Sequence, residues 1–243
     1  ARSTYDAPVT DKSLRKVVQY LMRDSSKSSY GYDYFGGHGT HVAGTVAGNN
    51  LNGTIIYNYD YYSNCADYID ECDSRFCTTC SEAGTCDETC EISPTEDYNG
   101  VAPGAKLMVY DFGDASGSLD VPTDMSTNIL YPAYNEGARI FSNSWGAAPP
   151  NNYYDTRAIN IDRFVYDEDE TLVLFSAGNS GYDYNGLRNE DASGDASVAT
   201  PAICKNVLTV GAAETAHTPD TVADFSSRGP SKDMRLKPEV VGP

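Results

Sequence analysis

Two histidines in a glycine-rich stretch are the residues with the clearest chemical potential. His38 and His41 lie three positions apart within residues 36–48 (GGHGTHVAGTVAG). An imidazole changes protonation near neutral pH, so it serves as a general base or as a metal ligand. The two side chains can share one helix face, as in metal sites, but zinc needs a third ligand, and the metalloprotease pattern H-E-x-x-H is absent. The small residues that follow predict a helix packed closely against its neighbours.

Two other polar motifs each follow a short apolar run. They are residues 143–146 (NSWG) and residues 176–181 (SAGNSG). By themselves, Asn143 and Ser144 fit the end of a buried strand, and Asn179 fits a turn between two glycines. The residue types alone therefore assign these motifs no chemistry.

Four apolar runs predict the strands that position these motifs. They cover residues 106–111, 138–142, 171–176 and 207–210. Apolar residues at helical spacing lie between the first three runs: Met125, Ile129, Leu130 and Ala133, then Tyr154, Ala158, Ile161 and Val165. Pro132 predicts a kink or an early break in the first helix. Strands that alternate with helices indicate an α/β domain, a parallel sheet flanked by helices on both faces.

Composition and charge narrow the class of protein. The 243 residues allow one large domain or two small ones, and 40% hydrophobic residues is ordinary for a folded domain. No run approaches the roughly 18 apolar residues of a membrane span, so we expect none in this chain. The net charge of −18 repels phosphates and argues against a nucleic-acid partner.

The cysteines are clustered in one acidic insertion. Residues 50–99 interrupt the rhythm of strands and helices, and residues 59–97 within them carry eleven acids and one base. Six cysteines lie there: Cys65, Cys72, Cys77, Cys80, Cys86 and Cys90. Their even number predicts three disulfides and an oxidising compartment, either extracellular or the lumen of the secretory pathway. A zinc knuckle is the alternative, but Cys77 and Cys80 have no second close pair or histidine nearby.

Two further features accompany the insertion. Cys204 stands far from the other cysteines and is expected to be free or paired outside the set. A second, milder insertion rich in glycine, aspartate and asparagine covers residues 181–197.

The order of the motifs resembles the subtilisin-like serine peptidases, the subtilases. GHGTHVAGTVAG is similar to the family's histidine motif, and six strings follow in the family's order: residues 100–105 (GVAPGA), 143–146 (NSWG), 176–181 (SAGNSG), 206–212 (NVLTVGA), 225–230 (FSSRGP) and 237–241 (KPEVV). The last two look closest to the oxidatively stable alkaline proteases. The resemblance implies a partial subtilisin-like peptidase domain over residues 1–243, with residues 50–99 as an insertion within it.

The resemblance implies two catalytic residues. His38 matches the histidine that acts first as general base and then as general acid on a serine nucleophile. Asn179 matches the side-chain amide that donates to the developing oxyanion. His41 is left with a structural role.

The resemblance also implies a peptide-binding surface. Ser144, Trp145 and Gly146 match the edge strand that pairs through its backbone with an extended peptide. Ser176 and Gly178 belong to the string similar to the oxyanion-hole segment and are expected to contact substrate.

The chain departs from the family pattern at the other two catalytic positions. The family's acid lies in D-S/T-G after a hydrophobic strand and orients the imidazole. No aspartate upstream of His38 is followed by Ser/Thr-Gly, and we expect none to end a strand; Asp6 fits best by spacing. Neither G-T-S nor G-x-S-x-G occurs, so the chain lacks the nucleophile's motif.

The resulting expectation is a serine endopeptidase domain that hydrolyses peptide bonds through an acyl-enzyme, in a chain that is incomplete and inactive by itself. The alternative is a non-catalytic structural or interaction protein that kept the scaffold. Expected partners are a peptide or protein substrate and a partner chain or further segments that complete the fold.

No cofactor is required, but calcium is a candidate ligand. In many relatives the connection that holds the acidic insertion forms a calcium loop. The competing interpretation is an acidic surface module held by disulfides, and no metal ligands can be assigned.

Overall fold

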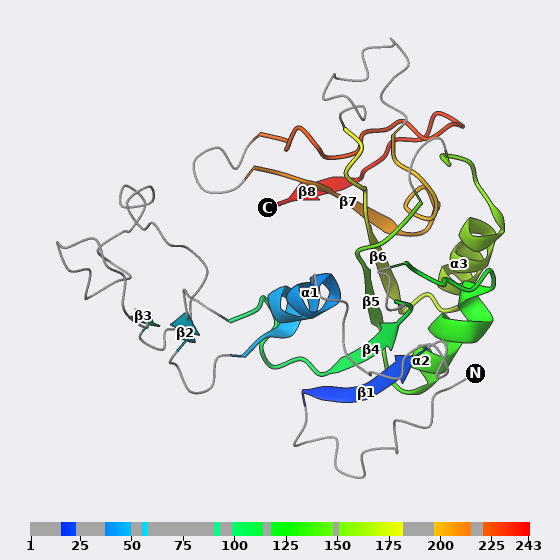
Figure 1. Ribbon diagram of the computed structural model, residues 1–243. Coiled ribbons are helices and arrows are strands. Elements are labelled where there is room, and N and C mark those ends of the chain that lie inside the picture. The colour runs from blue at the N-terminus through cyan, green and yellow to red at the C-terminus, as the bar shows by residue number, and fades with distance from the viewer. Residues whose placement is uncertain are drawn as a thin grey trace. The chain divides into compact units, whose positions relative to one another are not determined.

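The computed structural model describes residues 16–22, 37–49, 55–57, 90–92, 99–113, 118–147, 151–181, 197–214 and 221–243 (Figure 1). The chain divides into two compact units. The larger comprises Ala1–Pro8, Gln19–Tyr34 and Met108–Pro243, and the smaller comprises Val9–Val18 and Phe35–Leu107.

A four-stranded parallel sheet forms the centre of the larger unit. Its strands follow one another in the order β5 (Ile140–Asn143), β6 (Leu172–Ser176), β7 (Leu208–Ala212) and β8 (Val240–Gly242). Each neighbouring pair is parallel. Three of these strands confirm predicted apolar runs to within two residues, and β8 comes from the KPEVV string.

Helix α3 (Thr156–Asp167) joins β5 to β6, as the helical spacing predicted. Asp155 caps its start, because the Asp155 carboxylate accepts a hydrogen bond from the Ala158 backbone at 2.9 Å. Ala158, Ile161 and Phe164 are fully buried, so one face of α3 packs on the sheet.

Pro132 distorts the preceding helix without breaking it. A π-helical turn, η3 (Ser126–Leu130), runs directly into α2 (Tyr131–Asn135). The Tyr131 N–H donates to the Ser126 carbonyl, five residues back. Proline has no N–H and its ring crowds the carbonyl four residues earlier, and a wider turn relieves this conflict. Of the predicted kink or early break, the structure shows a local distortion and no break.

The hydrophobic core lies between these helices and the sheet. Figure 1 shows α2 and α3 on the same side of β5 and β6. Phe164 is central, since its ring meets Tyr131 at 5.0 Å and Phe141 at 5.6 Å, both edge to face. These helices on a parallel sheet confirm the predicted α/β class.

A buried carboxylate ties α3 to the entry of β7. Asp162 is only 6% exposed. It accepts hydrogen bonds from the backbones of Lys205 and Asn206 and from the Tyr154 hydroxyl, at 2.6–2.8 Å. Because all three donors converge on one carboxylate, the CKN sequence before β7 is held against α3.

A buried lysine joins β7 to the start of β8. Lys237 is 4% exposed and pairs with Glu239 at 2.6 Å. Its ammonium also donates to the Thr209 hydroxyl at 3.0 Å, while the Thr209 backbone donates to Glu239. The KPEVV string is thus structural, because the buried lysine is paired with a glutamate at the surface.

The smaller unit contains helix α1 (His38–Ala47), which confirms the helix expected in the glycine-rich stretch. Two short strands of the acidic insertion, β2 (Ile55–Tyr57) and β3 (Cys90–Ile92), pair antiparallel. β1 (Val17–Met22) and β4 (Leu107–Asp111) form a separate two-stranded sheet. β4 was predicted, whereas β1 was not.

Three other predictions concern the cysteines and the absence of a membrane span, and the described residues cover them only in part. Cys204 is a free, buried thiol. The other cysteines lie outside the described residues except the backbone of Cys90, so the disulfides stay a prediction. No helix in the described part of the chain is long and apolar enough to span a membrane.

Candidate active site

The segment after β6 exposes three of the predicted site residues. Ser176, Gly178 and Asn179 are all exposed, while Ala177 between them is buried. The Ala177 N–H donates to the Val210 carbonyl on β7 at 2.8 Å. Gly178 has a φ of +104°, a conformation that L side chains rarely adopt, so the glycine is needed for the turn.

The same segment is held on its other side by residues 225–227. The Ser180 N–H donates to the Ser227 hydroxyl at 3.0 Å, and the Ser227 N–H donates to the Gly178 carbonyl at 2.9 Å. The Gly181 N–H donates to the Phe225 carbonyl at 2.9 Å. The Asn179 side chain is therefore exposed on a backbone fixed at both ends, which suits a preorganised hydrogen-bond donor.

The segment after β5 is anchored through Trp145. Its ring packs edge to face on Phe112 and Phe175, with centroids 5.6 and 5.4 Å away. Its indole N–H donates to the Asn143 side chain at 3.1 Å, and Asn143 in turn donates to the Leu174 carbonyl. Trp145 thus positions the segment through its side chain.

The backbone of this segment is available for pairing. Within the described residues, Ser144, Trp145 and Gly146 make no backbone-to-backbone hydrogen bond, and the next pairing is from the Ala147 N–H to the Thr200 carbonyl at 2.9 Å. Gly146 is exposed, and Ser144 and Trp145 are half-buried. The pairing of these three residues with an extended peptide stays a prediction.

The sheet brings the two segments to the same edge. β5 and β6 are parallel, with Asn143 opposite Phe175. Residues 144–146 and 176–179 therefore both leave the carboxyl ends of adjacent strands, where parallel sheets commonly form binding sites. Five substrate-binding candidates and Asn179 belong to this edge.

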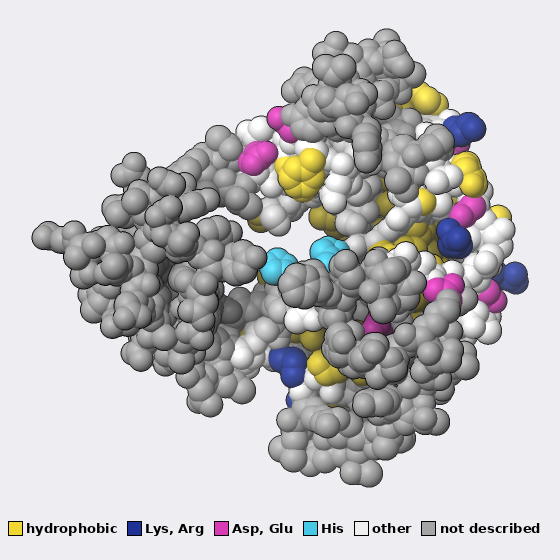
Figure 2. All heavy atoms as spheres, viewed as in Figure 1, with side chains coloured by type: hydrophobic (Ala, Val, Ile, Leu, Met, Phe, Trp, Pro, Cys, Tyr) yellow, Lys and Arg dark blue, Asp and Glu magenta, His cyan; other side chains and the backbone are white. Residues whose placement is uncertain are grey.

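His38 lies in the smaller unit, at the first position of α1. Its side chain is exposed, as is that of His41, and both described histidines are visible at the surface in Figure 2. Gly37 caps the helix with φ at +59°, which again requires glycine. The structure thus presents the His38 imidazole at a helix start, and its meeting with Asn179 stays a prediction.

The far end of α1 shows the close packing that its small residues predict. The N–H groups of Val101 and Ala102 donate to the carbonyls of Thr45 and Val46 at 3.0 and 2.8 Å. A Cβ on Gly100 would lie 2.5 Å from the Gly44 carbonyl oxygen. The GVAPGA string therefore satisfies the last carbonyls of α1 and fixes the helix that carries His38.

Strand β1 was not predicted, and an aspartate follows it in the sequence. β1 ends at Met22, and Asp24 follows it two positions later, with Ser25 next. Asp24 is followed by Ser25 and Ser26 rather than by Ser/Thr-Gly, and it lies outside the described residues. The position of the family's acid therefore stays a prediction, with Asp24 as a second candidate beside Asp6.

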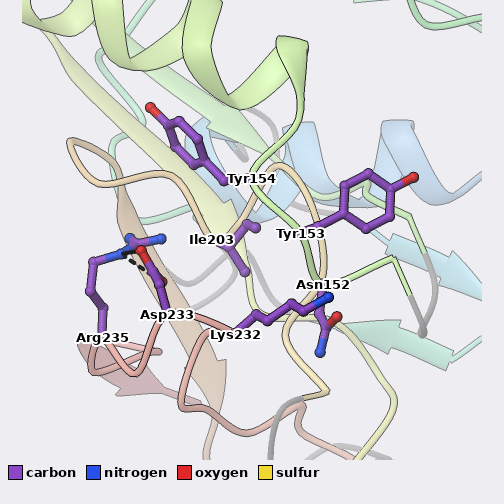
Figure 3. Close-up of a pocket in the computed structure, with 7 residues that line it drawn as sticks. All are labelled: Asn152, Tyr153, Tyr154, Ile203, Lys232, Asp233 and Arg235. Atoms are coloured by element: carbon purple, nitrogen blue, oxygen red, sulfur yellow. Dashed lines mark hydrogen bonds and ion pairs between the residues drawn. The ribbon is translucent and has the colours of Figure 1, made fainter.

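A small pocket lies apart from all these residues. It has a volume of about 180 Å³ and is lined by Asn152, Tyr153, Tyr154, Ile203, Lys232, Asp233 and Arg235 (Figure 3). The Arg235 guanidinium pairs with Asp233 at 2.9 Å, and this pairing lowers the pKa of the Asp233 carboxyl to about 2. None of the predicted site residues lines this pocket.

Comparison with known proteins decides the family. The sequence profile of the subtilase family, Peptidase_S8, matches residues 4–243. The chain belongs to the subtilase family. As a subtilase, it contains within the matched range both the histidine motif and the two segments at the carboxyl edge of the sheet.

Three individual relatives share 30% identity or less with this chain, and the chain spans only part of their length. The chain is 30% identical over 209 residues to the serine protease/ABC transporter B family protein tagD of Dictyostelium discoideum, covering 84% of this chain and 8% of that protein. It is 28% identical to pyrolysin of Pyrococcus furiosus, covering 99% of this chain and 17% of pyrolysin. Among solved structures, Sphericase aligns with a TM-score of 0.43 and 25% identity over 63% of this chain and 48% of that chain.

Proposed function

We propose that this subtilase domain belongs to a serine endopeptidase that hydrolyses peptide bonds through an acyl-enzyme. The main support is the carboxyl edge of the sheet, where an exposed Asn179 on a fixed backbone lies beside a segment with unpaired backbone groups. A peptide that pairs with residues 144–146 would bring its carbonyl toward a donor already in place.

Each matched residue has a defined task in this mechanism. The neutral His38 imidazole takes the proton of the serine hydroxyl during attack and returns it to the leaving amine. The Asn179 side-chain amide donates to the oxygen that becomes negative in the tetrahedral intermediate. Ser144, Trp145 and Gly146 hold the peptide in an extended conformation.

The acid and the nucleophile complete the proposal. We propose Asp24 as the acid, because it lies two residues after β1 in the sequence, although Ser25 and Ser26 rather than Ser/Thr-Gly follow it. There it would hold the His38 imidazole in the required tautomer. The nucleophilic serine comes from sequence outside these 243 residues, because the G-T-S motif is absent from them. The isolated chain is accordingly inactive.

The acidic insertion supports a proposal about the protein's environment. Three disulfides among the six clustered cysteines fit an extracellular or lumenal peptidase of the oxidatively stable alkaline type. In the described part of the chain, no group of three or more His, Cys, Asp or Glu side chains could hold a metal ion. The acidic composition of the insertion makes it the place where calcium is a candidate ligand.

The test is labelling and turnover with the natural full-length protein. A serine-directed fluorophosphonate should label one serine and abolish cleavage of an unfolded protein substrate. The His38→Ala variant should show neither labelling nor cleavage. The 243-residue chain serves as the control and should be neither labelled nor active. A full-length protein that is folded but unlabelled and inactive would instead support the non-catalytic scaffold.

A further inference from the structure

One buried serine binds both peptide groups that flank Asn179. The Ser227 hydroxyl accepts the Ser180 N–H at 3.0 Å, and the Ser227 N–H donates to the Gly178 carbonyl at 2.9 Å. The first bond holds the peptide group after Asn179, and the second holds the one before it. Ser227 is only 1% exposed, so water does not compete for these bonds.

The backbone around Ser227 leaves little room for adjustment. A Cβ on Gly178 would lie 3.0 Å from the Ser227 hydroxyl oxygen, and φ at Gly178 is +104°. The bare backbone of Gly178 is thus matched to the serine that packs on it. Gly181 shows the same fit, since a Cβ there would lie 2.3 Å from the Ser226 carbonyl oxygen.

The neighbouring Ser226 is equally buried, but its hydroxyl accepts a hydrogen bond from a different part of the chain. Ser226 is also 1% exposed, and its hydroxyl accepts the Ala212 N–H on β7 at 3.0 Å. Ser226 therefore ties residues 225–227 to the sheet, whereas Ser227 ties Asn179 to residues 225–227. This difference separates general structural support from the positioning of one side chain.

We propose that Ser227 is a positioning residue for the oxyanion donor: it fixes the direction of the Asn179 side chain by holding the peptide groups on both sides of it. The inference rests on the proposed function, because it assigns Ser227 a part in the same reaction. With both flanking peptide groups held, the Cα–Cβ bond of Asn179 has one direction, and the amide need not reorganise when the oxyanion forms.

The kinetic experiment compares matched serine variants of the full-length protein. Ser227→Ala should lower kcat on a peptide substrate by about tenfold and leave KM within about twofold, because the donor meets a group present only after attack. Ser226→Ala loses a hydrogen bond of equal length and burial, and should change kcat by less than about twofold. In an Asn179→Ala background, Ser227→Ala should lower kcat by less than about twofold more.

A second measurement is independent of activity. Hydrogen exchange of the Ser180 amide, followed by mass spectrometry in the full-length protein, should be about tenfold faster in Ser227→Ala and unchanged in Ser226→Ala. This result holds even in a protein without turnover, so it separates failure of this inference from failure of the proposed function.

Three outcomes would overturn the inference. One is a kcat loss in Ser226→Ala as large as that in Ser227→Ala, which would show general destabilisation. Another is a full loss from Ser227→Ala in the Asn179→Ala background, which would show that Ser227 acts elsewhere. The third is unchanged exchange at Ser180 in Ser227→Ala, which would show that the hydroxyl does not hold this peptide group, whatever the activity of the wild-type protein.

Discussion

The two segments proposed for catalysis are supported in contrasting ways. Asn179 lies on a short turn whose backbone is bound on both sides, to β7 and to residues 225–227. His38 lies at the start of a ten-residue helix, and the GVAPGA string meets the last carbonyls at the opposite end of that helix. In both cases the reacting side chain is exposed and other residues hold the backbone.

The comparison shows where substitutions should act. The turn that carries Asn179 is fixed locally, so a change in a single hydrogen bond there should alter the chemistry. The GVAPGA string holds the end of α1 opposite His38, so a change there should alter stability first.

The largest effect is expected from the general base. In the full-length protein, His38→Ala should lower kcat by about 10⁴-fold or more, because the serine hydroxyl then stays protonated at neutral pH. His41→Ala is the control on the same helix, and its kcat should stay within about threefold of wild type. Steady-state turnover of a peptide substrate measures both, and near-normal turnover in His38→Ala would show that the histidine role is misplaced.

The acid should rank next. Asp24→Asn should lower kcat by about 10³–10⁴-fold, because an amide favours the wrong tautomer of the imidazole, whereas Asp6→Asn should have little effect. The same turnover assay compares the two variants. A large loss of kcat in Asp6→Asn with little effect of Asp24→Asn would identify Asp6 as the acid instead.

The oxyanion donor should follow. Asn179→Ala should lower kcat by about 10²–10³-fold with KM nearly unchanged; this magnitude is the one known for the equivalent type of residue in a subtilisin. A full kinetic analysis separates the two constants. A rise in KM alone would mean that Asn179 binds the ground state.

Substitution of Gly100, which packs against the last turn of α1, should lower the stability of the protein. Gly100→Ala would place a Cβ 2.5 Å from the Gly44 oxygen and from the Gly48 nitrogen, both backbone atoms that cannot move independently. We expect a loss of about 2–3 kcal/mol in the free energy of unfolding. Gly104→Ala is the matched control, because a Cβ there meets nothing within 4 Å. Denaturant unfolding compares them, and equal stability of the two variants would contradict the packing described for Gly100.

The smallest expected loss of stability concerns the helix cap Asp124, which belongs to neither the Asn179 turn nor helix α1. The Thr127 N–H donates to the Asp124 carboxylate at 3.0 Å, and this bond lowers the pKa of Asp124 from its ordinary value of 3.8. Asp124→Ala should lower the free energy of unfolding by about 1 kcal/mol at neutral pH.

The pH dependence of that cap has a defined sign. Because the pKa is lowered in the folded state, the ionised cap stabilises the protein above the unfolded pKa, and this contribution is lost as the pH falls through the folded pKa. Unfolding measured from pH 7 downward should therefore show the difference between Asp124→Ala and wild type shrinking. A difference that grows toward low pH would contradict the role of the carboxylate.

The strands and helices of the larger unit were largely predictable from local sequence. Apolar runs such as residues 171–176 and spacing such as that of Ala158 and Ile161 reflect which faces must be buried, and this requirement is written in the sequence. β1 was missed although its apolar run was visible. At Pro132 the local rule allowed a kink or a break, and a π-helical turn accommodates the proline without a break.

The sequence by itself determined which residues are available for chemistry: the histidine motif, the NSWG and SAGNSG strings, the acidic cysteine cluster and the family they indicate. Only the tertiary structure decided which of them share an edge of the sheet and what holds them there. The contacts of Ser227 with Gly178 and Ser180 join positions 47 or more residues apart. No local spacing predicts such contacts, because they depend on how the strands between them pack.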